Sequence, residues 1–117
     1  MEKEKVYVLC RWFKRKIKIK ITIELENTIK DHENLTQNCE WIYSNFCQKC
    51  ENSANKGKRT AKYIEVITYR PLSQTYSDKK YFTCLTQILT EKLAICDFLS
   101  FSVDIQNNGC LCIKAEW

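Results

Sequence analysis

The 117-residue sequence predicts a single α+β domain, in which two helices pack on one face of a mainly antiparallel sheet of about five strands. Three observations predict this class. Segments near both ends alternate apolar and polar residues, which is the period of a half-buried strand. Two longer segments repeat apolar residues at steps of three and four, which is the period of a helix. The length suits one modest core, and no linker or repeat divides residues 1–117.

Residues 6–26 are predicted to form the first two strands. The second of them has a clean period of two, carried by Ile17, Ile19, Ile21, Ile23 and Leu25. Residues 6–13 are strand-like but apolar on both faces. Between the two, Lys14 and Arg15 replace the Gly or Asn that a tight hairpin prefers, so one long bent strand is the alternative.

Residues 28–55 and 78–96 are predicted to be helices. The first carries one apolar stripe, formed by Leu35, Cys39, Ile42, Phe46 and Cys50. Its start is either Thr28, which has capping-box spacing to Asp31, or Asn34. Trp41 falls on the side opposite the stripe. The second helix is capped by Ser77 or Asp78, and its apolar face is formed by Tyr81, Phe82, Leu85, Leu89, Leu93 and Cys96.

The remaining strands are predicted at residues 60–70, which Pro71 ends, and in a C-terminal hairpin. A three-residue loop, 107–109, brings the alternating apolar residues of both hairpin strands onto one face. It pairs Ile105 with Leu111 and places Gly109 in the left-handed position of a bulge. The predicted element order is therefore ββαβαββ. Its open sheet face carries Lys16, Lys18, Lys20, Thr22, Ser102, Asp104 and Lys114.

The net charge is +5, and it is concentrated in the first half of the chain. Residues 1–62 hold 14 basic and 8 acidic groups, whereas residues 63–117 hold 5 basic and 6 acidic groups. Such asymmetry is typical of a protein that binds a negatively charged partner, although a basic face that contacts only solvent gives the same pattern. The predicted binding residues are the basic side chains Arg11, Lys14, Arg15, Lys16, Lys18, Lys20, Lys56, Lys58, Arg59 and Lys62, together with Trp41.

Several classes of enzyme are disfavoured. The chain has two glycines, which excludes a Walker loop and a dinucleotide-binding GxGxxG motif. His32 is the one histidine, and no nucleophile motif accompanies its neighbours Asp31 and Glu33. We interpret these two acids as the first turn of a helix, where the helix dipole favours negative charge.

Eight cysteines leave a zinc site as an alternative. Cys47 and Cys50 have CxxC spacing, and Cys110 and Cys112 would complete four thiolate ligands. The first pair lies on a predicted helix and the second on a strand whose cysteines face away from the core, so the pairs do not point to one place. A late position in the helix also argues against thioredoxin-like chemistry. The sequence opens without a signal-peptide core, which predicts a reducing cytoplasmic location, free thiols and no membrane partner.

The sequence therefore predicts a non-enzymatic binding protein without a cofactor. Its size suits a small inhibitor or adaptor of the kind that viruses and phages encode, docking a basic sheet face and exposed aromatics on an acidic protein or ribonucleoprotein. Direct binding of RNA or DNA by the basic strand is the first alternative, with Trp12, Phe13, Tyr63 and Tyr69 available to stack on bases. A small thiol- or zinc-dependent enzyme is the second.

Overall fold

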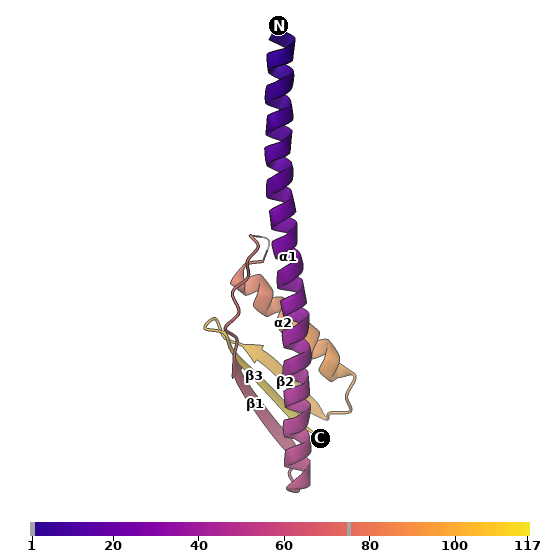
Figure 1. Ribbon diagram of the computed structural model, residues 1–117. Helices are drawn as coiled ribbons and strands as arrows, with labels where there is room; N and C mark the ends of the chain where they lie inside the picture. The colour runs from indigo at the N-terminus through magenta and orange to yellow at the C-terminus, as the bar shows by residue number, and fades with distance from the viewer. Residues whose placement is uncertain (1, 75) are drawn as a thin grey trace.

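The computed structural model describes residues 2–74 and 76–117, with side chains from residue 22 onward. Two helices and three strands follow in the order α1, β1, α2, β2, β3 (Figure 1). Their bounds are Glu2–Asn55, Thr60–Val66, Asp78–Ala94, Ser100–Ile105 and Cys110–Glu116. The strands form one antiparallel sheet in the order β1-β3-β2, so β1 and β2 are its edges.

Both helices cover the same face of this sheet, and the core lies between the two layers. Figure 1 shows α1 crossing in front of the strands and α2 running alongside them. Sequence periodicity correctly located the helical contributions to the core. The buried residues are Leu35, Cys39, Ile42 and Phe46 of α1, Tyr81, Leu85, Leu89 and Leu93 of α2, and Ala61, Leu111, Ile113 and Ala115 of the sheet. The opposite face of the sheet, which we call the open face, is not covered by any described element.

The predicted five-strand sheet and the order ββαβαββ are wrong. Residues 6–26 belong to α1, which begins at Glu2 rather than near Thr28. Alternating isoleucine and lysine resembles a strand, but a strand needs a neighbour for its backbone N–H and C=O groups, whereas a helix satisfies these groups internally. No Gly or Pro stands between residues 2 and 55 to end the helix. Part of α1 consequently extends beyond the rest of the fold (Figure 1).

The C-terminal hairpin has the predicted register. Ile105 pairs with Leu111 and Val103 pairs with Ile113. Gly109 has φ 84°, and a Cβ atom at this position would lie 2.8 Å from the carbonyl oxygen of Ile67. Glycine is therefore required here both by the backbone angle and by the close approach of the β1–α2 loop.

α2 and β1 also form near their predicted positions. Ser77 is the N-cap of α2, and its hydroxyl accepts a hydrogen bond from the backbone N–H of Lys80 at 3.1 Å. β1 ends at Val66, four residues before the predicted end, because the chain then leaves the sheet.

The loop that follows β1 is fixed to α1 by Asp31, which is fully buried. Its carboxylate accepts hydrogen bonds from the Tyr69 hydroxyl at 2.6 Å and from the backbone N–H groups of Leu72 and Ser73 at 2.8 and 2.9 Å. Burial alone raises the pKa of this carboxyl, but these hydrogen bonds outweigh burial and hold the pKa below its usual value. The interpretation of Asp31 as part of an acidic first turn is wrong, since it lies in the middle of α1.

Candidate partner-binding surface

Basic side chains gather where α1 ends and β1 begins. α1 stops at Asn55, and the turn is closed by hydrogen bonds from the N–H of Gly57 to the carbonyl of Ala54 and from the N–H of Lys58 to that of Ser53, both 2.9 Å long. Gly57 has φ 76°, the left-handed conformation common after a helix. We call the surrounding cluster the basic end; it consists of the exposed residues Lys49, Lys56, Lys58, Arg59, Lys62 and Lys114.

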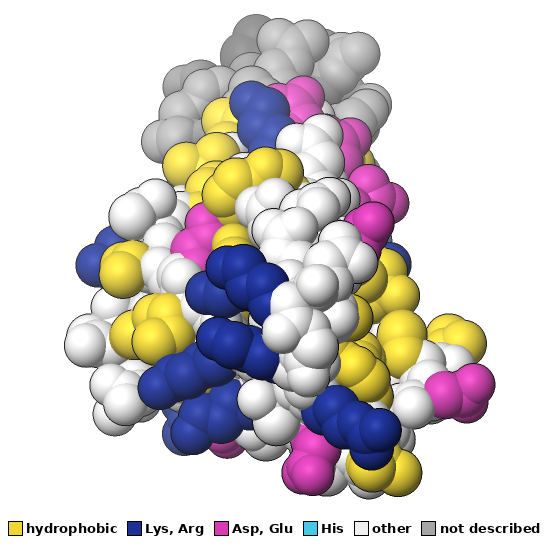
Figure 2. Space-filling view, turned by 90° about the horizontal axis from the view of Figure 1, so that it is seen from below, with side chains coloured by type: hydrophobic (Ala, Val, Ile, Leu, Met, Phe, Trp, Pro, Cys, Tyr) yellow, Lys and Arg dark blue, Asp and Glu magenta, His cyan; other side chains and the backbone are white. Residues whose placement is uncertain are grey.

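Figure 2 shows Lys and Arg side chains forming a band at this end of the molecule. Lys49, Lys58, Lys62 and Lys114 line one groove of about 720 Å³. Its other polar side chains are hydroxyls and the carboxylate of Glu116, whose oxygen lies 3.5 Å from the Ser100 hydroxyl. The lining of the groove therefore carries four positive side chains and one negative side chain.

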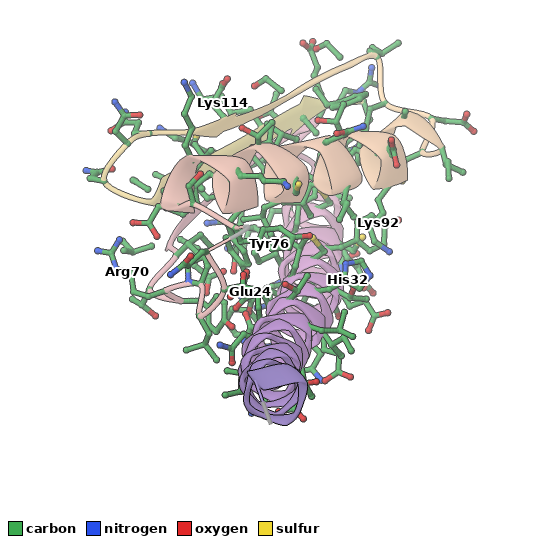
Figure 3. The ribbon with its side chains drawn as sticks, turned by 90° about the horizontal axis from the view of Figure 1, so that it is seen from above. Glu24, His32, Arg70, Tyr76, Lys92 and Lys114 are labelled. Carbon is green, nitrogen blue, oxygen red and sulfur yellow. The ribbon has the colours of Figure 1, made fainter. Side chains whose placement is uncertain are left out.

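The positive charges of the basic end are adjacent and have few counter-charges. Lys62 and Lys114 are direct cross-strand partners on the open face, where like charges repel each other. In Figure 3, Lys114 points away from both helices. Across the described side chains, the one salt bridge joins Arg70 to Asp78, which lie outside this cluster. An anionic partner would relieve the repulsion between the lysines.

The open face beside the basic end is apolar rather than aromatic. Ile64 and Val66 project from β1 and are 55% and 60% exposed. Their cross-strand partners are Cys112 and Cys110, which are half-buried. The predicted positions of Ser102 and Asp104 on this face are confirmed, because both are exposed and Asp104 pairs with Cys112.

Tyr63 and Tyr69, which were predicted to be available for base stacking, face the helices instead. The Tyr63 hydroxyl donates to Glu65 and accepts from the Asn45 side chain at 3.5 Å. The Tyr69 hydroxyl donates to Asp31, and burial together with this carboxylate raises the pKa of Tyr69 to about 12. Neither ring is on the open face. The side chains of Trp12 and Phe13 lie outside the described residues.

Trp41 is exposed, as its position opposite the apolar stripe predicts. It lies on α1 and is 55% exposed. With Asn34, Asn38 and the end of β1, it lines a separate hollow of about 440 Å³. Trp41 therefore lies beside the free edge of β1.

The other predicted binding residues do not form a strand. Residues 11–20 are helical in α1, so the predicted basic strand is wrong. The side chains of this run lie outside the described residues; they are Arg11, Lys14, Arg15, Lys16, Lys18 and Lys20. Two residues of the basic end, Lys49 and Lys114, were not predicted as binding residues. Lys114 was predicted on the open face, but its pairing with Lys62 depends on the register of β1 against β3, which was not predicted from the sequence.

The structure separates the two cysteine pairs of the alternative zinc site. Cys47 and Cys50 lie on α1, on the helical side of the sheet, whereas Cys110 and Cys112 are on the open face. Burial raises the pKa of the Cys50 thiol to about 11. Among the described side chains, no three His, Cys, Asp or Glu residues are grouped for metal binding.

The acidic and histidine side chains near residue 32 are also separated. Asp31 is buried in its contacts with the β1–α2 loop, whereas His32 and Glu33 are exposed. Figure 3 shows His32 on the flank of α1, away from that loop. This arrangement does not bring an acid and a base together at one site.

Comparison of the chain with protein-family models, with curated proteins and with solved structures gives no match. Within the residues that the structure describes, no helix has both the length and the apolar character needed to cross a membrane.

Proposed function

We propose that this chain is a binding protein that docks its basic end and the adjoining open face on an acidic surface of a partner protein. The observation that carries the proposal is the groove in which four lysines lie beside one carboxylate. Lysines in such a site attract and orient an acidic partner, since complementary charge raises the rate and specificity of association.

Ile64 and Val66 supply the apolar part of the proposed interface. They are exposed next to Lys62, so a partner that pairs with the lysines also covers these two side chains. A protein interface commonly has such an apolar centre with a charged rim. Single-stranded RNA is commonly bound by aromatic rings on a sheet surface, whereas the tyrosines of β1 and its loop point toward the helices.

Binding of fluorescent poly-L-glutamate at about 0.15 M salt tests the proposal. The variant Lys58→Glu/Lys62→Glu is compared with Lys79→Glu/Lys80→Glu, which makes the same charge change at the start of α2. We expect the first variant to bind about 30-fold more weakly, from roughly 1 kcal/mol for each reversed charge. The affinity of the second variant for poly-L-glutamate should fall by less than about threefold.

Two results would overturn the proposal. Equal losses in both variants would show that polyglutamate responds to net charge alone. Tighter binding of polyuridylate than of polyglutamate at the same salt would identify a nucleic acid as the partner. Circular dichroism of each variant checks that the fold is intact.

A further inference from the structure

One edge of β1 has no partner strand in the described structure, and its backbone is ready to accept one. The N–H of Ile67 donates to the Gly109 carbonyl, and the N–H of Trp117 donates to the Arg59 carbonyl. Along an antiparallel pair, every second residue directs its backbone N–H and C=O groups toward the neighbouring strand. The backbone groups of the odd-numbered residues of β1 therefore point toward β3. The N–H and C=O groups of Lys62, Ile64 and Val66 therefore point to the free edge.

Two hollows of about 440 and 470 Å³ lie along this free edge, each with α1 on one side and β1 or the residues following it on the other. We call the two together the edge groove, as distinct from the groove lined by the four lysines. The α1 wall carries an amide stripe at helical spacing, formed by Asn34, Asn38, Asn45, Gln48 and Asn52. Hydrogen bonds of 3.0 Å between the Asn34 and Asn38 amides and of 3.2 Å between those of Gln48 and Asn52 order this stripe.

The two ends of the edge groove differ in charge. Lys49, Lys56 and Lys58 line one end. Trp41 and Glu65 line the other. An extended chain lying in the edge groove would therefore fit best with acidic residues at the lysine end and an apolar residue beside Trp41.

We propose that an extended acidic segment of the partner protein adds to β1 as a fourth strand of the sheet. The inference rests on the proposed function and specifies how the partner is held. Backbone hydrogen bonds to Lys62, Ile64 and Val66 supply the pairing. Alternate side chains of the segment lie toward the amide stripe and toward the open face, where a carboxylate meets Lys62.

The charges and the space in the edge groove favour a peptide segment over a second copy of the chain. A lysine near the middle of an edge strand is a common device against pairing between identical edges. A second copy would bring its own α1 alongside, and a helix with its side chains is about 10 Å wide, whereas a single extended segment needs less room beside β1.

Amide hydrogen exchange by NMR tests strand addition, with a ten-residue peptide of alternating glutamate and valine as the probe. At a peptide concentration about ten times its Kd, exchange at the amides of Lys62, Ile64 and Val66 should slow by about tenfold. The amides of Ala61 and Tyr63, which already face β3, serve as internal controls and should change little.

Two N-methylated forms of the peptide provide a second test. One is methylated at every valine nitrogen and the other at every glutamate nitrogen. Because alternate residues of a strand face its neighbour, one form should bind like the parent and the other should bind at least about tenfold more weakly.

The outcomes separate this inference from the proposed function. Equal affinities of the two methylated forms, or unchanged exchange at the three edge amides while polyglutamate still binds, would overturn strand addition and leave the proposed function standing. Failure of both polyglutamate and the peptide to bind would overturn both. Edge protection that rises with protein concentration without peptide would show that a second copy occupies the edge.

Discussion

Replacing Asp31 by alanine should strongly destabilise the fold, because three hydrogen bonds end on this one carboxylate. The substitution leaves the Tyr69 hydroxyl and the amides of Leu72 and Ser73 without their acceptor. A buried donor without an acceptor costs about 1–3 kcal/mol. Since Leu72 is partly exposed and water can replace its bond, we expect a total loss of about 3–5 kcal/mol in the free energy of unfolding.

Urea denaturation at pH 7 measures this loss. Asp104→Ala is the matched control, because Asp104 is exposed on β2 and its replacement should change stability by less than about 0.5 kcal/mol. A loss below about 1 kcal/mol for Asp31→Ala would refute the conclusion that this carboxylate anchors the β1–α2 loop.

The same carboxylate predicts a pH dependence. Its pKa in the folded protein lies below the ordinary value of 3.8, so the ionised form stabilises the native state above about pH 4. That stabilisation is lost as the pH falls through the folded-state pKa. Asp31→Asn should therefore be less stable than the natural protein at pH 7 and should lose less stability below pH 4. Parallel acid profiles for the two proteins would contradict this assignment.

Three further comparisons test the packing. Gly109→Ala should cost about 2–4 kcal/mol in urea denaturation, whereas Gly57→Ala, which has open space around it, should cost about 1 kcal/mol. Phe46→Ala should cost about 3–5 kcal/mol, and Trp41→Ala, at an exposed site, less than about 1 kcal/mol. Cys39 is buried with its pKa raised to about 11, so iodoacetamide at pH 8 should alkylate it only after unfolding, as peptide mass spectrometry would show.

Most of the domain from residue 35 onward could be predicted because its local signals agree with its tertiary packing. The stripe from Leu35 to Phe46 combines a helical period with burial. Ser77 begins α2 through a side-chain cap that the sequence displays. Gly109 fixes the hairpin register, because shifting the strands by one residue would expose the apolar face. In each case one short segment contains the decisive information.

The N-terminal third could not be predicted in the same way. The alternation from Ile17 to Leu25 favours a strand only if a neighbouring strand is available, and the sequence of the segment does not show whether one is. Because this segment belongs to α1, the predicted basic strand does not exist. The basic cluster that the described side chains form lies instead around Lys58 and Lys62. The role of Asp31 was also hidden, because its donors lie about 40 residues away in the sequence.

The most direct test of the proposed binding surface is an NMR titration of the ¹⁵N-labelled protein with poly-L-glutamate, in which backbone chemical shifts report where the polyanion binds. We predict that the largest shifts occur at residues 56–62 and at Lys49 and Lys114, a set that includes every residue of the basic end, and that the shifts are reduced at about 0.5 M salt. Largest shifts on the basic run of residues 11–20, or shifts spread evenly over all lysines of the protein, would contradict binding at the basic end.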